Sequence, residues 1–507
     1  MADNPKSIDG LNRRDVLKCG LYGGLAAGVL PSVFLSGCGK KRQGKRPNII
    51  VLTVDTLRAD HTSMHGYHRD TTPAINAFAK SAMVFDNAIV SRGSTRPSYA
   101  SMLTGLYPYR HGIYNSQGVL SDTLVTLPAL LKKAGYHTAA FVGNFVLVGE
   151  LSGCDRGFDV YDDRIEQQEL NRPNYERTAA ATLKASLEWL ETKPSEPFFL
   201  FTNFVDPHGP YMPPEKFREL YKSGKKRTLS EKQIFKYQRV GGSLNYHDYV
   251  DRYDGEIRYV DEALGELIEA LKKKGLWEDS LIIFTADHGE SLGEHGVFFE
   301  HQYYIWEETV RVPLAIRLPR DPGGSDIAAP RRIKSVCSPM DMMPTILSYL
   351  DVGFDKKIDG RNLLDAIYGR EDTSRTMFLE FPQISIPSQT TPEIYGVRSS
   401  THKLVRYFDP KTNQISGQAI FDITADPLEQ KQIAYDRTIA MHRELGDELD
   451  AMLKKRSNYK LPFSLIYYDV PLAGRKEYVE KRKKGSKTIK QLTPEQIKKL
   501  RSLGYID

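Results

Sequence analysis

Three apolar runs rich in β-branched residues and Phe occur at 47–55, 197–208 and 280–288. Runs of this kind are typical of strands that are buried on both faces of a mainly parallel sheet. Residues 254–274 instead repeat apolar positions with the helical period. The alternation over 47–350 predicts an α/β fold, in which a mainly parallel central sheet is flanked by helices. We expect a small C-terminal α+β subdomain after it.

Polar side chains stand where each apolar run ends. Asp55 closes the first run, Asp206 and His208 close the second, and Asp287 and His288 close the third. A single acid at a strand end is most often a turn or a helix cap. Because the pattern recurs, and because open α/β folds build their sites at the carboxyl edge of the sheet, the sequence favours a functional site here.

Residues 94–105 (STRPSYASMLTG) place a hydroxyl residue, Thr95, two positions before Pro97. Pro is favoured in the first turn of a helix, so the pattern predicts a strand-to-helix turn with free N–H groups around it. Thr95 then projects from the turn as a nucleophile, or else Ser94 or Thr95 merely caps the helix. From this segment alone the two interpretations are equally supported.

Charge is distributed unevenly along the 507 residues, whose formal net charge is +6. Residues 1–46 carry +6, 454–491 carry +9 and 492–507 carry +1, which leaves −10 for residues 47–453. An acidic body argues against nucleic acid as a partner. Two cysteines remain beyond the N-terminal region, too few for a disulfide framework.

The N-terminal residues have the pattern of a targeting signal. Arg13 and Arg14 precede a short apolar run, which ends in Leu-Ser-Gly before Cys38. This resembles a twin-arginine export signal (1–37) joined to a lipoprotein cleavage box, with a lipidated Cys38 and a basic tether over 38–46. We expect a membrane-anchored lipoprotein of the bacterial envelope that faces the periplasm or the exterior. The alternative is an ordinary membrane helix with a chance cysteine.

Seven motifs in order resemble the sulfatase branch of the alkaline-phosphatase superfamily, from about Pro47 to about Asp450. The motifs are NIIVLTVDTLRAD, STRPSYASMLTG with YPYRHG, FVDPHGPY, FTADHGESLGEHG, VRVPLAIR, DMMPTIL and FDITADPLEQ. The resemblance implies a catalytic domain over 47–374 and a C-terminal subdomain over 375–453. The basic tail over 454–507 lies outside the family core, and its Thr-Pro-Glu-Gln sequence predicts a short helix near the end.

The same resemblance implies roles for individual residues. A divalent metal ion is expected on Asp55, Asp287 and His288, with Thr95 as the nucleophile that contacts the same ion. His208 and His301 match positions that contact the ester or protonate the leaving oxygen. Two further positions, Tyr99 and Asn144, are expected to bind the substrate.

Departures from the family pattern change the expected chemistry. Family sulfatases convert a Cys or Ser in Cys/Ser-x-Pro-x-Arg to formylglycine, whereas this chain has Thr95 and, in place of the Arg, Tyr99. Thr56 replaces a metal-binding Asp, and 143–146 (GNFV) lacks the Lys and His that grip sulfate. A His at position 288 in place of Asn favours Mn²⁺ or Zn²⁺ over Ca²⁺ or Mg²⁺. We expect one ion.

These departures predict a metal-dependent hydrolase that cleaves a phosphodiester, a phosphonate or a phospho-headgroup ester through a covalent phospho-Thr. The partner is expected to be an anionic ester, for example in an envelope glycolipid or glycan. One alternative is an aryl or carbohydrate sulfatase that works without formylglycine. The other is a silent pseudoenzyme that binds a glycan or phosphoester. The sequence does not indicate the oligomeric state.

Overall fold

The computed structural model describes residues 46–116, 118–165, 176–320, 328–382, 392–409 and 412–459. The expected export signal, Cys38 with its tether, and the tail helix lie outside these ranges. Within them, no helix has both the length and the apolar character needed to cross a bilayer.

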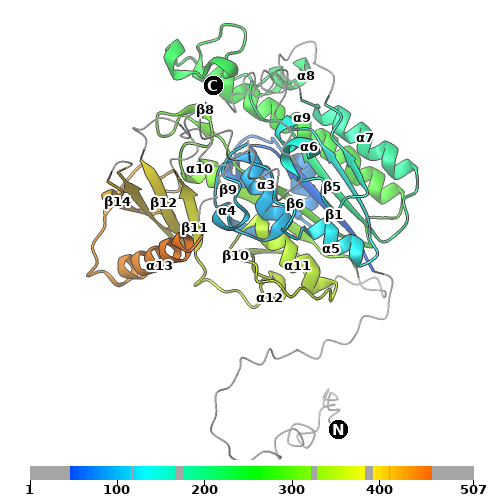
Figure 1. The fold of residues 1–507 in the computed structure, drawn as a ribbon. Coiled ribbons are helices and arrows are strands. Elements are labelled where there is room, and N and C mark those ends of the chain that lie inside the picture. The colour runs from blue at the N-terminus through cyan, green and yellow to red at the C-terminus, as the bar shows by residue number, and fades with distance from the viewer. Residues whose placement is uncertain are drawn as a thin grey trace, which may run out of the picture. The chain divides into compact units, whose positions relative to one another are not determined.

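An eight-stranded sheet forms the centre of the domain (Figure 1). Its strands, in spatial order, are β10 (Arg331–Cys337), β2 (Met83–Ile89), β9 (Arg311–Arg317), β6 (Ser280–Ala286), β1 (Asn48–Val54), β5 (Phe198–Phe204), β3 (His137–Val142) and β4 (Val160–Asp162). Every neighbouring pair is parallel except the two that involve β9. The three apolar runs are therefore β1, β5 and β6, adjacent and buried along their whole length, which confirms the predicted α/β fold.

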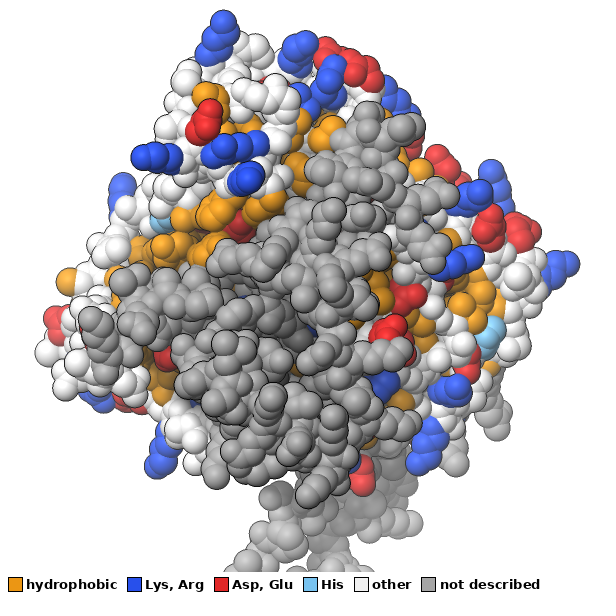
Figure 2. All heavy atoms as spheres, turned by 45° about the horizontal axis from the view of Figure 1, so that its top comes forward, with side chains coloured by type: hydrophobic (Ala, Val, Ile, Leu, Met, Phe, Trp, Pro, Cys, Tyr) orange, Lys and Arg blue, Asp and Glu red, His pale blue; other side chains and the backbone are white. Residues whose placement is uncertain are grey.

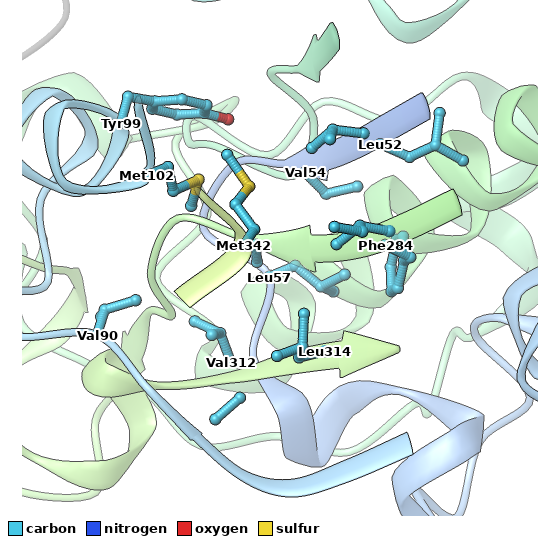
Figure 3. Packing of buried hydrophobic residues seen from close by; sticks show 14 of the residues in the cluster. Leu52, Val54, Leu57, Val90, Tyr99, Met102, Phe284, Val312, Leu314 and Met342 are labelled. Carbon is cyan, nitrogen blue, oxygen red and sulfur yellow. The ribbon is translucent and has the colours of Figure 1, made fainter. Parts of the chain in front are cut away.

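Helices cover both faces of this sheet in two groups. One contains α3 (Thr95–Thr104), α5 (Leu127–Lys133) and α11 (Met342–Tyr349), and the other contains α2 (Pro73–Ala79), α7 (Ala179–Glu191), α8 (Glu215–Leu220) and α9 (Tyr246–Lys273). Figure 3 shows Met102 of α3 and Met342 of α11 near Leu52, Val54 and Phe284 of the central strands. The four short helices are α4 (Pro108–His111), α6 (Gly149–Ser152), α10 (Glu307–Val310) and α12 (Leu364–Ile367).

The helix expected from Asp254 starts earlier than its aliphatic pattern indicated. It begins at Tyr246, where the side chain of Asn245 caps the amide of His247. Tyr249 and Tyr253 continue the buried face toward the N-terminus. Tyr carries a polar end, so an aliphatic pattern did not detect these two turns.

A separate five-stranded antiparallel sheet forms the C-terminal subdomain, as expected. It contains β11 (Met377–Phe381), β12 (Glu393–Arg398), β13 (His402–Phe408), β14 (Ile415–Asp422) and β15 (Ile433–Ala434), and α13 (Ala440–Ser457) packs on it. Residues 394–408 lie in two of these strands, β12 and β13, and in the turn that joins them. The last helix runs past the expected boundary at 453, and Lys455 and Arg456 pair with Asp359 and Glu380.

Buried ion pairs join this subdomain to the catalytic domain. Lys403 of β13 lies 3.3 Å from Glu307 of α10 and 2.9 Å from Glu429. Arg398 of β12 pairs with the same Glu307 at 2.9 Å. All four side chains are buried, and Glu307 lies close in sequence to His301, so the interface orders a segment next to the predicted site.

Candidate active site

Strand register brings the predicted metal ligands together. Val54 is level with Ala286 of β6 and with Phe204 of β5, so the residues that follow all emerge at one edge of the sheet. Asp55, Asp287 and His288 each offer a ligand atom, and these atoms lie within 4.8 Å of one another. All three side chains are fully buried. The structure thus assembles the predicted cluster from Asp55 and a pair of residues that follow it 232 and 233 positions later.

The two carboxylates of the cluster are held in the same way. One oxygen of Asp55 accepts a hydrogen bond from the Asn144 amide at 2.5 Å, and one oxygen of Asp287 accepts the backbone N–H groups of Thr56 and His288. The other oxygens, Asp55 Oδ1 and Asp287 Oδ2, are buried without a hydrogen-bond partner. A buried carboxylate oxygen without a partner is costly unless a cation compensates it.

His288 presents its second nitrogen to this pair of oxygens. Its Nδ1 lies 2.8 Å from the Gly289 carbonyl, to which it must donate a proton, so Nε2 of the neutral ring carries a lone pair. That Nε2 lies 3.7 Å from Asp55 and 3.5 Å from Asp287. Two free carboxylate oxygens and one free imidazole nitrogen fit a divalent cation. Within the described ranges, no Lys or Arg forms an ion pair with either acid.

Burial raises the pKa values of both acids. It raises the pKa of Asp287 to about 8, an effect that the hydrogen bonds from the Thr56 and His288 N–H groups oppose. The pKa of Asp55 also lies well above its usual value, because of burial first and the neighbouring Asp287 second. Two buried acids with raised pKa values side by side are the usual electrostatic signature of a functional site. A bound cation would bring both back to the charged form.

Thr95 is the first residue of α3, and its Oγ1 lies 3.2 Å from Nε2 of His288. The preceding residue, Ser94, is the N-cap in extended conformation, but its side chain makes no capping bond. The Thr95 hydroxyl therefore faces the cluster. Ser94 thus does not cap the helix through its side chain, and the role of Thr95 as nucleophile stays a prediction.

Thr56 has a role that the sequence did not reveal. Its φ is 52°, in the left-handed region that a β-branched residue rarely adopts. This turn directs its N–H at Asp287, while its carbonyl accepts the Tyr253 hydroxyl at 2.6 Å. A strained residue that fixes a ligand from its backbone is typical of functional sites. At the position where the family pattern has a second metal-binding Asp, this chain therefore contributes its backbone N–H.

Two more imidazoles complete the cluster. The ring of His301 lies 4.4 Å from that of His288 and 5.3 Å from that of His208. Nδ1 of His301 lies 3.1 Å from Glu290, and its Nε2 is buried without a hydrogen-bond partner. Nδ1 of His208 lies 2.8 Å from the carbonyl of Gly209. Each ring is thus held at Nδ1.

Glu290 is the second residue that sequence reasoning missed. One of its oxygens contacts His301, and the other accepts the Tyr211 hydroxyl at 3.0 Å. It follows His288 by two positions, and this spacing on a loop gave no signal of its own. Burial raises its pKa to about 8. Burial also lowers the pKa of His301, with His288 as the second cause.

The two predicted substrate-binding residues lie beside the cluster and support it. Asn144 holds Asp55. The buried Tyr99 hydroxyl lies 2.7 Å from both Thr53 and Asn203, at the ends of β1 and β5. Direct contact of either with a substrate stays a prediction. His295, a further imidazole of the FTADHGESLGEHG motif, contacts Glu308 at 2.9 Å.

Comparison with known proteins agrees with this geometry. The sulfatase family model matches residues 47–352. The chain belongs to the sulfatase family. A second model, described as N-sulphoglucosamine sulphohydrolase, C-terminal, matches residues 293–458 of this sulfatase-family chain. Members of the family, which is part of the alkaline-phosphatase superfamily, are hydrolases of sulfate or phosphonate esters, most of them metal-dependent, and this chain is such an ester hydrolase.

The relatives include both chemistries. An N-acetylglucosamine-6-O-sulfatase of Bacteroides thetaiotaomicron is 23% identical over 495 residues, covering 80% of this chain and 86% of the relative. A multifunctional alkaline phosphatase superfamily protein of Trinickia caryophylli is 24% identical over 488 residues, covering 78% and 92%. The solved phosphonate monoester hydrolase of Agrobacterium radiobacter shares the fold, with a TM-score of 0.67 at 21% identity over 81% of this chain and 96% of its own.

Proposed function

We propose that this sulfatase-family hydrolase cleaves a phosphorus ester, a phosphodiester or phosphonate monoester, through a covalent phospho-Thr95. The observation that carries the proposal is the contact of 3.2 Å between Thr95 Oγ1 and Nε2 of His288, beside two free carboxylate oxygens. The hydroxyl thus stands where the metal ligands converge.

The choice of phosphorus over sulfur rests on what Thr can do. A formylglycine hydrate expels sulfate by breaking its own C–O bond, but Thr cannot form that group. An adduct on Thr95 must be released by attack at the central atom. Phosphorus accepts such an attack in phosphoryl transfer, and we expect sulfo-Thr to turn over more slowly.

Individual residues then have defined tasks. A divalent ion on Asp55, Asp287 and His288 would polarise the ester and lower the pKa of a nearby hydroxyl. Thr95 loses its proton and forms a bond to phosphorus while the bond to the leaving oxygen breaks. Nε2 of His301 takes up the Thr95 proton and gives it to that oxygen, and Glu290 at Nδ1 stabilises the ring while it is charged. Water then attacks phosphorus and frees Thr95.

The kinds of ligand atom in the cluster also indicate which metal ion it prefers. One imidazole nitrogen with two carboxylate oxygens is a mixed set, which suits Mn²⁺ or Zn²⁺ better than the all-oxygen ligation of Ca²⁺ and Mg²⁺. We propose a single ion, because His295 is engaged elsewhere.

Hydrolysis of a sulfate ester by an unmodified Thr is the second candidate. It is favoured by relatives such as the N-acetylglucosamine-6-O-sulfatase and a choline-sulfatase of Rhizobium meliloti, 26% identical over 444 residues. A silent binding protein is less well supported, because Asp55, Thr95, Asp287 and His288 all bear competent groups in contact.

We further propose that the protein is an exported lipoprotein, held to the bacterial envelope through Cys38, with an anionic glycolipid or glycan ester as substrate. The support is the sequence pattern at 13–38. Detection of a lipid-modified peptide that begins at Cys38 tests the anchor separately from the chemistry.

Rapid quenching of the Mn²⁺- or Zn²⁺-loaded protein with an aryl phosphodiester tests the covalent step. We expect peptide mass spectrometry to find on Thr95 a phosphoryl group that still carries the second ester arm of the diester, and to find the same adduct in the Ser94→Ala control. With an aryl sulfate, any sulfo-Thr95 that forms should persist, because its release is slow, and turnover should not continue beyond one equivalent. Turnover of the diester without any adduct on Thr95 would contradict the proposal.

A further inference from the structure

A strongly basic lobe stands on the acidic domain. We define the basic lobe as residues 222–239 (KSGKKRTLSEKQIFKYQR), which hold seven Lys or Arg and one Glu, a charge of +6. Residues 47–453 carry −10 in total, so the same stretch without the lobe carries −16. The lobe thus concentrates positive charge on a body of the opposite sign.

The inner side of the lobe is built against the catalytic site. The Tyr237 hydroxyl donates to Glu300, whose other oxygen accepts the backbone N–H of His301 at 2.9 Å. Gln238 is buried so tightly on Gly209, beside His208, that a Cβ there would lie 1.8 Å from its amide oxygen. The lobe therefore borders both imidazoles that handle the leaving group.

Backbone pairing fixes the lobe in this place. Ile234 forms a parallel bridge with Phe298 of the strand β8 (Phe298–Glu300), and Thr228 pairs with Asn245 at the start of α9. The Phe235 ring, 38% exposed, stacks on Tyr303 two positions after His301. The lobe is a structured wall of the site.

Its outer side carries cations that face solvent. Arg239 pairs with Glu231, and Arg227 lies over the rings of Tyr246 and Phe298. Four lysines of the lobe are exposed and form no ion pair with any described acid: Lys225, Lys226, Lys232 and Lys236. Figure 2 shows Lys and Arg side chains gathered beside hydrophobic ones at the top of the same face.

We propose that the basic lobe binds a polyanionic extension of the substrate, a chain that carries further sulfate or phosphate groups beyond the ester at Thr95. This inference rests on the proposed function and names its substrate class more closely. Unpaired lysines on an acidic body attract anions over a distance and raise their local concentration at the site.

A polymer fits these observations better than a membrane surface. The chain enters the domain at Arg46, just before β1, whereas the lobe borders the site at the opposite end of the strands. The lobe therefore stands at the end of the sheet opposite the point where the N-terminal residues join the domain.

The test compares two sets of four Lys→Gln substitutions in the full chain. The lobe variant changes Lys225, Lys226, Lys232 and Lys236. The control variant changes Lys80, Lys133, Lys193 and Lys273, which are exposed and precede β2, β3, β5 and β6 at the opposite edge of the sheet. Both variants lose the same charge.

Binding of labelled dextran sulfate and inhibition of aryl diester turnover by it are measured at low ionic strength. We expect the lobe variant to bind and to be inhibited at least about tenfold more weakly than the wild type, with the control within about twofold. Turnover of the diester alone should stay unchanged in both. Equal losses in the two variants would overturn the proposal.

Two further results distinguish failure of the lobe proposal from failure of the proposed phosphoesterase function. Binding to phosphatidylglycerol vesicles without binding to dextran sulfate would replace the polymer by a membrane surface and overturn the inference. Lobe-dependent binding of dextran sulfate in a protein that does not turn over the diester would support the lobe while the proposed phosphoesterase function fails.

Discussion

Asn144 donates a hydrogen bond of 2.5 Å to Oδ2 of Asp55, and this contact leaves Oδ1 of the same carboxylate facing the cluster without a partner. The two residues lie 89 positions apart and follow β1 and β3, which flank β5 in the sheet. The side-chain oxygen of Asn144 also accepts the N–H of Val146, so the amide cannot rotate freely. The loop after β3 thereby orients a metal ligand on β1.

Replacing Asn144 by Ala should weaken metal binding by about 10- to 100-fold, the usual effect of losing a group that orients a ligand. Titration of Mn²⁺ into the metal-free protein by calorimetry measures this. Asn245→Ala is the control, since it also removes a helix cap, worth about 0.5–2 kcal/mol, but stands away from the metal ligands. Equal metal affinities in the two variants would show that Asn144 does not orient Asp55.

The stability of the metal-free protein should fall as pH rises. The pKa of Asp287 is about 8 in the folded protein, above its usual 3.8, so its stabilising contribution is complete below about pH 4 and lost as pH rises through about 8. A bound cation needs the charged carboxylates, so its stabilising effect should grow over the same range.

The assignment of Asp287 as a metal ligand can be tested by measuring the melting temperature with EDTA and with Mn²⁺, each in buffers of pH 6.0 and 8.5. We expect a larger gain from Mn²⁺ at the higher pH, and a much smaller pH effect in Asp287→Asn. If the rise in melting temperature on adding Mn²⁺ became smaller at the higher pH, the assignment of Asp287 as a ligand would be contradicted.

His301→Gln should slow the reaction in a way that depends on the leaving group. A general acid contributes about 10²–10⁴ in rate when the departing oxygen needs a proton. We expect a large loss with phenyl esters and a small one with 4-nitrophenyl esters, measured as kcat/KM for each. Loss by the same factor for both would indicate that His301 binds substrate without donating a proton.

Lys403→Met should destabilise the joint between the two sheets. The substitution leaves Glu307 and Glu429 buried with one cation fewer, and breaking a buried pair in this way costs about 3–5 kcal/mol. Urea unfolding compares it with Lys431→Met, an exposed lysine nearby. A similar free energy of unfolding in both variants would show that the buried network contributes little.

Much of the catalytic core was predictable because its signals are local. The apolar runs of β1, β5 and β6 end in the residues that form the cluster, and parallel strands bring such ends to one edge. Thr95 stood out through its spacing to Pro97. His61 and His111 lie outside the cluster and contact Asp254 and Ser101.

The supporting contacts were not predictable, because they depend on chain segments far apart in sequence. The left-handed backbone of Thr56 lets its N–H donate to Asp287, which lies 231 positions later in the sequence. Glu290 reaches His301 only because the strand pair β7 (Ser291–Leu292) and β8 folds the loop back on itself. The Asn144 contact likewise needs β3 and β1 to lie one strand apart.

The central claim is that Thr95 attacks phosphorus. The most direct measurement compares kcat/KM for an aryl phosphodiester with that for the matching aryl sulfate, using metal-loaded wild type, Thr95→Ala and the neighbouring Ser94→Ala. We predict that the diester is strongly preferred, that Thr95→Ala abolishes its turnover, and that Ser94→Ala keeps it. Preference for the sulfate, or diester turnover that survives in Thr95→Ala, would contradict the claim.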